Sequence, residues 1–161
     1  MRAAVVGGYG PPEVVRIEER PKPVPRAHEV LIRVRASTVG TWDAEARAFS
    51  FPAWFWLPLR LAMGVRTPRW PVLGEEVAGD VEAGGADVTS FRPGDAVFAA
   101  LGLGVGRHAE HLCDPERATI AHKPETLSYE EAACIPVGGD NALHFLRLAQ
   151  VRPGERVLVN G

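Results

Sequence analysis

The chain has 161 residues, of which 46% are hydrophobic and 24% are charged, and its formal net charge is −2. This length and composition are typical of one soluble globular domain with a proper core. The charge balance, without any Lys/Arg block, argues against nucleic acid or an anionic membrane as a partner, and no apolar stretch approaches the ~20 residues of a membrane span.

The first 36 residues predict strands that are separated by turns. Short β-prone runs cover residues 2–6 and 14–19, and a Gly/Pro-rich turn lies between them. Residues 29–36 alternate apolar and polar side chains from Leu31 onward, which makes this run the clearest strand.

Residues 37–70 break this pattern. We expect a short helix over residues 41–48 with Thr41 as its cap. The following aromatic segment, residues 49–70, has two interpretations. It is either a loop or short helix packed over a β-barrel, or an apolar wall over a substrate pocket formed by Trp54 and Trp56. Its prolines and its length exclude a membrane span.

Residues 71–123 return to short apolar runs and Gly-rich turns, as in a small β-barrel. The runs predict strands at 72–77, 79–81, 96–99 and 109–113, with a tight turn at 91–95. Further on, Ser128 to Glu131 is a capping box that opens a helix ending before Pro136. Asp140 is expected to cap a second helix, and residues 156–159 are expected to form a buried parallel strand.

The two cysteines, Cys113 and Cys134, are far apart in the sequence, which fits a protein of a reducing cellular compartment. They form no Cys-x-x-Cys pair, which argues against a disulfide scaffold and against a cysteine-rich zinc site. The N-terminal segment has no long apolar stretch of the signal-peptide kind. We therefore expect a cytoplasmic protein.

The segment 71–99, PVLGEEVAGDVEAGGADVTSFRPGDAVFA, resembles the signature of the medium-chain dehydrogenases/reductases, the family of alcohol dehydrogenases and quinone oxidoreductases. The likeness continues through the strand at 30–36 with Asp43 after it, residues 106–111, and residues 151–161. It implies a mainly β fold with short helices, in which a GroES-like, partly open β-barrel precedes a Rossmann domain. The expected parts are a GroES-like catalytic domain (1–125), a helical connector (126–150) and a first Rossmann strand (151–161).

The resemblance also indicates whether a catalytic zinc is to be expected. In zinc-dependent members the three ligand positions match Gly40, Glu75 and Val137 of this chain. A catalytic zinc needs three Cys, His or carboxylate ligands, and one carboxylate does not supply them. We therefore expect no zinc and a place in the zinc-independent, quinone-oxidoreductase-like branch.

That branch implies hydride transfer from NADPH, or NADH, to a quinone or an α,β-unsaturated carbonyl compound. Such substrates delocalise the developing negative charge themselves, so that the reaction needs no Lewis acid. The resemblance implies the following sites: catalytic residues Thr41, Asp43 and Glu75; substrate-pocket residues Trp54 and Trp56; cofactor-binding residues Gly40, Asn141 and Gly161. Each catalytic residue also has a structural interpretation: Thr41 as a helix cap, Asp43 as a structural carboxylate, and Glu75 as a polar strand end.

Two other functions stay open at this point. One is an alcohol dehydrogenase acting on alcohols or aldehydes, and the other is a stand-alone GroES-like binding or co-chaperonin-like module. We expect the 161 residues alone to hold no dinucleotide tightly and to be inactive, since the family's phosphate turn follows Gly161. Exposed apolar edges at the C-terminal strand favour a homodimer.

Overall fold

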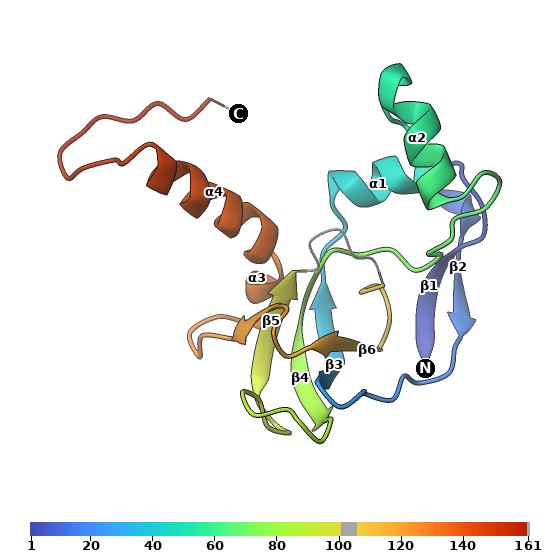
Figure 1. Ribbon diagram of the computed structural model, residues 1–161, viewed down its shortest axis with the longest axis horizontal. Coiled ribbons are helices and arrows are strands. Elements are labelled where there is room, and N and C mark those ends of the chain that lie inside the picture. Colours follow the sequence, from blue (N-terminus) through green and yellow to red (C-terminus); the bar gives the residue numbers. More distant parts are fainter. Residues whose placement is uncertain (101–105, 161) are drawn as a thin grey trace.

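The computed structural model describes residues 1–100 and 106–160, which form a curled antiparallel sheet with short helices around it (Figure 1). The sheet has five strands in the order β6 (His111–Pro115), β3 (Glu29–Ser37), β4 (Glu76–Gly84), β5 (Ala96–Ala100) and β7 (Thr119–His122). A separate hairpin pairs β1 (Arg2–Val6) with β2 (Val15–Glu19), and a 3₁₀ turn, η1 (Pro12–Val14), lies between them. Isolated bridges join β1 to Ala109 and Val72, so the hairpin closes one side of the curl.

This architecture confirms the mainly β, GroES-like prediction, with small differences in the strands. The predicted strands at 2–6, 14–19, 29–36 and 96–99 are present within about one residue. Two strands were expected at 72–77 and 79–81, but the structure has one continuous strand, β4, from Glu76 to Gly84. Residues 72–75 lie before this strand and lead the chain into the sheet. The strand expected at 109–113 begins only at His111, and β7 was not predicted since its pairing with β5 is a long-range contact.

The core of the barrel lies inside the curled sheet. Alternate side chains of β3, β4 and β5 point inward, as the two-residue period of a strand requires. Together with Phe91 from the turn before β5 and Leu112 from β6, they form one cluster of buried residues: Val30, Ile32, Val77, Val81, Phe91, Val97, Ala99 and Leu112. Burying these branched side chains is the main favourable term that holds the barrel together.

One glycine of β4 has a specific role in this packing. A Cβ at Gly79 would lie 2.2 Å from the carbonyl oxygen of Arg33 on β3. We expect Gly79→Ala to lower the free energy of unfolding by about 3 kcal/mol, measured by urea denaturation. Gly138→Ala is the matched control, because a Cβ there meets no heavy atom of the described residues within 4 Å and alanine favours a helix. Equal stability of the two variants would contradict the β3–β4 packing.

The helices begin partly where the sequence predicts. In α1 (Thr41–Ala48) the cap is Gly40, so the expectation that Thr41 caps this helix is wrong; the Asp43 carboxylate accepts from the Gly40 N–H at 2.9 Å. The predicted capping box of α3 (Tyr129–Ala133) is confirmed, since Ser128 and Glu131 bond to each other's backbone N–H.

The next helix, α4 (Pro136–Leu148), starts five residues earlier than expected, since its cap position is Ile135 and not Asp140. The prediction that Asp140 caps it is wrong, because proline is pre-organised for the first helical turn and the helix begins there. Figure 1 shows α4 running away from the sheet.

The aromatic segment contains a helix, α2 (Ala53–Met63), that packs beside β1. Its inward side chains join a second cluster of buried residues: Val6, Ala46, Phe49, Met63 and Leu73. The segment is therefore a short helix over the barrel, as one of the two interpretations expects.

Residues 151–160 form no strand, so the buried parallel strand expected at 156–159 is not observed in this chain. Leu158 and Val159 are 90% and 85% exposed. A parallel strand exists only beside a hydrogen-bonded neighbour, and no strand within 1–100 or 106–160 pairs with this segment. In the same ranges, no helix has the length and apolar character needed to cross a bilayer.

Candidate active site

Three segments that are far apart in the sequence meet at one end of the barrel. They are the end of β3 with the start of α1, the turn that enters β4, and the start of α4. Asp43 joins the first two: its Oδ2 accepts from the Gly40 N–H and its Oδ1 from the Gly74 N–H, each at 2.9 Å. The Asp43 side chain is buried, so this carboxylate fixes the position of the turn that carries Glu75.

Glu76 joins the first and third segments in the same way. Its Oε2 accepts from the Thr38 hydroxyl at 2.7 Å, and its Oε1 accepts from the Val137 N–H at 2.8 Å. The Ser37 hydroxyl donates to the Glu76 carbonyl at 2.9 Å. Glu76 therefore fastens the start of α4 to the barrel beside Glu75.

Glu75 is the carboxylate that this framework leaves available. It is half-buried and accepts no hydrogen bond from any group in the described part of the chain. Burial raises the pKa of Glu75, and the nearby negative charges of Asp43 and Glu76 raise it further. A carboxyl group that keeps its proton above the usual pH range can act as a proton donor.

The same environment predicts a pH-dependent effect on stability. Because the folded state raises the pKa of Glu75, the folded protein binds this proton more tightly than the unfolded chain, and the stability falls as pH rises from the ordinary glutamate pKa through the folded one. We expect Glu75→Gln to raise the thermal midpoint at pH 7 and to leave it nearly unchanged at pH 4, measured by calorimetry. A lower midpoint at pH 7 would show that Glu75 is instead a favourably bound anion.

His108 packs directly against the turn that carries Glu75. A Cβ on Gly74, whose φ is +103°, would lie 2.7 Å from the His108 Cδ2 atom, so only glycine permits this approach. His108 Nε2 lies 2.9 Å from the Thr38 carbonyl oxygen and 3.9 Å from Asp43 Oδ2. Since a carbonyl only accepts, Nε2 is the ring nitrogen that donates in this contact.

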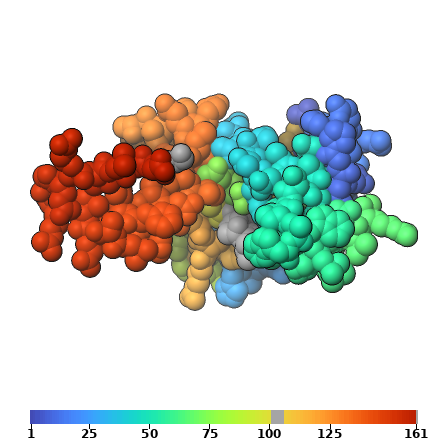
Figure 2. Space-filling model, turned by 90° about the horizontal axis from the view of Figure 1, so that it is seen from above, coloured from blue at the N-terminus to red at the C-terminus, as the bar shows by residue number. Residues whose placement is uncertain are grey.

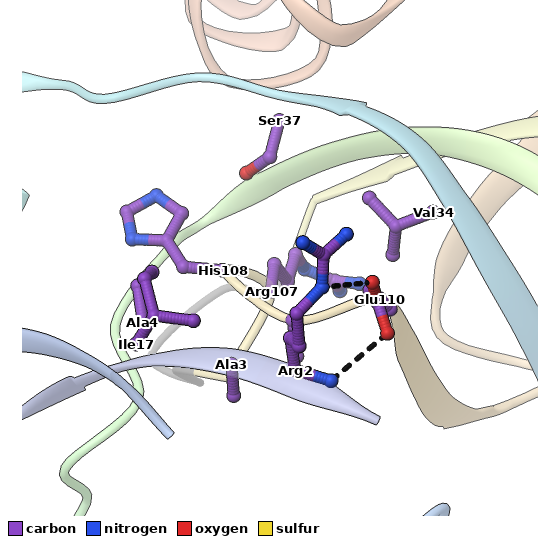
Figure 3. Close-up of a pocket in the computed structure, with 10 residues that line it drawn as sticks. Arg2, Ala3, Ala4, Ile17, Val34, Ser37, Arg107, His108 and Glu110 are labelled. Carbon is purple, nitrogen blue, oxygen red and sulfur yellow. Dashed lines mark hydrogen bonds and ion pairs between the residues drawn. The ribbon is translucent and has the colours of Figure 1, made fainter. Parts of the chain in front are cut away.

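Two cavities adjoin His108. One, of about 450 Å³, lies between the β1–β2 hairpin and α1 and is mainly apolar; its lining includes Val6, Val39, Asp43, Leu73 and His108. This volume suits a small organic molecule. The second, of about 390 Å³, is drawn in Figure 3; its lining includes His108, Ser37 and the Arg2–Glu110 ion pair, whose atoms lie 2.7 Å apart.

A buried ion pair supports the floor of the second cavity. Arg107 is fully buried, and its Nη1 donates to Asp114 Oδ2 at 2.6 Å. Burial lowers the pKa of Arg107 and raises that of Asp114, while their mutual attraction opposes both changes. Because one buried charge without the other is strongly destabilising, this pair holds the segment before β6 in place next to His108.

The other predicted site residues that the structure describes take no part in the Asp43 and Glu76 contacts, apart from Gly40 and Val137. Thr41 is exposed on the first turn of α1, and Asn141 is exposed on α4. Trp54 is 80% exposed, whereas Trp56 packs edge-on against Phe49 at 5.7 Å. Gly161 lies outside the described residues.

The sequence analysis missed four residues of this site: Ser37, Thr38, Glu76 and His108. Each takes part through a contact with a residue more than thirty positions away, as in the Thr38–Glu76 bond. The sequence signal for Glu76 is its place in the Gly-Glu-Glu turn. His108 has no comparable signal, since it precedes an ordinary strand.

A catalytic zinc does not fit these residues. Gly40 has no side chain, Val137 is apolar, and Glu75 alone supplies an oxygen ligand. Across residues 1–100 and 106–160, no three His, Cys, Asp or Glu side chains are grouped so that they could hold a metal ion.

Comparison with known proteins agrees with the fold. The family model of the alcohol dehydrogenase GroES-like domain matches residues 26–136. The quinone oxidoreductase of Pongo abelii is 32% identical over 163 residues, which cover 100% of this chain and 45% of that protein. This chain spans about half the length of the curated relatives that it matches.

Solved structures give the same picture. The quinone oxidoreductase from Coxiella burnetii superposes with a TM-score of 0.79 at 30% identity, over 96% of this chain and 47% of that one. A mycobacterial protein complexed with NADPH superposes with a TM-score of 0.73 at 29% identity, over 97% of this chain and 43% of that one. The shared part is the barrel with its adjoining helices.

Proposed function

This chain belongs to the alcohol dehydrogenase GroES-like domain family, in the quinone-oxidoreductase-like branch of the medium-chain dehydrogenases/reductases, and we propose the following function for it. It is the catalytic domain of an oxidoreductase that uses NADPH or NADH to reduce quinones or α,β-unsaturated carbonyl compounds without a catalytic zinc. The observation that carries this proposal is Glu75. It is a half-buried carboxyl group with a raised pKa, and it occupies a position where zinc-dependent relatives hold their metal.

The proposal includes the division of the protein into parts. Residues 1–125 form the catalytic barrel, residues 126–150 connect it, and residues 151–161 enter a nucleotide-binding domain. The exposed apolar side chains of residues 157–159 support the assignment of residues 151–161 to a nucleotide-binding domain, because such side chains are normally covered by further structure.

The residues beside Glu75 fit a nicotinamide ring. Gly40 has no side chain to obstruct a flat group, and Val39 and Val137 expose apolar surface next to the Asp43 and Glu76 bonds. In the proposed site Gly40, Asn141 and Gly161 hold the cofactor. When bound, the reduced nicotinamide supplies the hydride.

The side chains of this chain then supply the proton and the orientation. In its protonated form, which the raised pKa favours, the Glu75 carboxyl donates a hydrogen bond to the substrate carbonyl oxygen and passes its proton to that oxygen as negative charge develops there. One hydride and one proton complete the two-electron reduction of a quinone to a hydroquinone. Asp43 and Glu76, which are held by backbone and hydroxyl donors, keep Glu75 in place. The Thr41 hydroxyl offers a second hydrogen-bond donor to the substrate, in addition to the Glu75 carboxyl group.

Substrate comparison tests this function. The protein at its natural length is assayed for oxidation of NADPH and NADH with a panel of quinones and enones, and for reduction of NAD(P)⁺ with simple alcohols. We expect turnover of quinones or enones and little turnover of alcohols. Alcohol oxidation that depends on added zinc would show that the alcohol dehydrogenase alternative is right.

A further inference from the structure

The helix α2 has two apolar faces, and the fold uses only one of them. Leu59 and Met63 point into the cluster around Phe49 and Leu73, and Trp56 packs on Phe49. Trp54, Leu57 and Leu61, spaced i, i+3 and i+7, lie along the opposite face and are 80%, 61% and 57% exposed. A helix that is apolar all round is normally covered on every side.

Exposed apolar side chains also occur in the residues that follow the helix in the sequence. Val65 and Trp70 are also exposed, so that several large apolar side chains gather within one stretch of 17 residues. Figure 1 shows α2 projecting from the body of the molecule, and in Figure 2 the teal-green atoms of this part of the chain lie at the surface. Exposed apolar side chains that gather in this way mark an interaction surface.

The charges around the stripe indicate what kind of surface it meets. Residues 46–74 contain four arginines and no aspartate or glutamate. Arg66 and Arg69 are exposed and form no ion pair with any side chain in the described ranges. The nearest acidic residues in the sequence are Glu45, on α1, and Glu75, in the site.

Arg60 adds a third positive charge at the edge of the helix. Its guanidinium lies 4.0 Å from the centre of the Tyr9 ring and 4.4 Å from that of Phe49. The aromatic faces hold this cation against the molecule while its stem covers apolar surface. Tryptophan and leucine on one face, with arginines at the border, are the features of a helix that lies in a membrane interface.

We propose that α2, together with residues 64–70, is a docking surface for an anionic lipid bilayer, with Trp54, Leu57 and Leu61 entering the interface and Arg66 and Arg69 contacting the headgroups. The helix lies on the membrane and does not cross it. The formal charge of −2 hides this feature, because the acidic excess lies in other parts of the chain. The proposal does not depend on the reaction at Glu75, because it concerns binding in the absence of cofactor and substrate.

Vesicle binding of the protein at its natural length tests this surface. Sedimentation with vesicles of phosphatidylcholine alone is compared with vesicles containing about one third phosphatidylglycerol. We expect binding to the anionic vesicles, a blue shift of the tryptophan emission, and release at high salt, where the headgroup charges are screened. Absence of binding, or equal binding to both kinds of vesicle, would overturn the proposal.

Variants separate the two components of the surface. Trp54→Gln with Leu61→Gln removes the apolar stripe but leaves the inward packing intact, and we expect it to abolish binding. Arg66→Gln with Arg69→Gln is expected to weaken binding by about 25-fold, at roughly fivefold per arginine near an anionic surface. The matched control is Ile17→Gln with Val24→Gln, two exposed apolar side chains elsewhere, which leaves binding unchanged.

A second copy of this chain is the alternative partner of the stripe, and light scattering distinguishes it from a membrane. If the wild-type protein is a dimer by light scattering and Trp54→Gln with Leu61→Gln makes it a monomer without any loss of vesicle binding, the stripe is an interface between two copies. That result would overturn the membrane proposal.

Discussion

Replacing Glu75 with glutamine is expected to lower kcat for quinone reduction by about 100-fold, the lower end of what a positioned general acid contributes. Glutamine keeps the size of the side chain and its ability to donate a hydrogen bond, but it has no proton to transfer. The measurement is steady-state oxidation of NADPH at saturating quinone by the protein at its natural length. Because the loss concerns proton transfer, KM should change much less than kcat.

The pH profile distinguishes this role from a structural one. In the wild-type protein kcat should fall as pH rises through the raised pKa of Glu75, because the acid then loses its proton. The Glu75→Gln profile should lack this limb. Glu130→Gln, at an exposed carboxylate on α3, is the control and should keep the wild-type profile. If Glu75→Gln retained both full activity and the high-pH limb, Glu75 would only fill the place of a metal ligand.

Replacing Asp43 with alanine is expected to reduce the free energy of unfolding by about 3 kcal/mol. The substitution leaves the N–H groups of Gly40 and Gly74 without their shared acceptor and removes the reciprocal bond at the start of α1. In a domain of this size the corresponding fall in the thermal midpoint is about 10 °C. Differential scanning calorimetry measures it.

Two further variants make this prediction specific. Asp43→Asn retains one acceptor oxygen and should lose roughly half as much stability. Glu45→Ala, on the same helix, removes a carboxylate without a side-chain hydrogen bond to the described residues and should change stability by less than about 0.5 kcal/mol. If Asp43→Ala were no less stable than Glu45→Ala, Asp43 would not be the residue that fixes the Gly74–Glu76 turn.

Asp43 and Glu75 are neighbouring carboxylates whose environments favour different roles. The sequence analysis treated both as catalytic candidates with a structural alternative. Asp43 is saturated by two backbone donors and buried, which favours a structural role, whereas Glu75 is left free by its neighbours. Whether either acts in catalysis stays a prediction that the kinetic experiments test.

Much of the barrel could be predicted from the sequence because its signals are local. The alternation in residues 29–36 and the capping box at Ser128 depend on neighbours a few positions apart, and both are confirmed. The exact start of α4 was missed because Asp140 and Pro136 both carry start signals, and the proline, with its fixed φ, prevails. The cap of α1 was missed because an Asp43 carboxylate compensates for the absence of a side chain on Gly40.

The site could be predicted only in outline, since its contacts are long-range. The family resemblance identified Glu75, but no local pattern shows that His108 rests on Gly74 or that Glu76 holds the start of α4. The strand expected at 156–159 shows the same limit from the other side. Its apolar residues carry the pattern, but a strand forms only where a partner strand is present.

We propose that this domain supports hydride transfer to quinones with Glu75 in place of a metal ligand. The most direct test measures zinc content and NADPH-dependent quinone reduction on the same preparation of the natural-length protein, before and after dialysis against a chelator. We expect far less than one zinc per chain and an unchanged kcat after dialysis. One zinc per chain, with activity lost on chelation and restored by zinc, would contradict it.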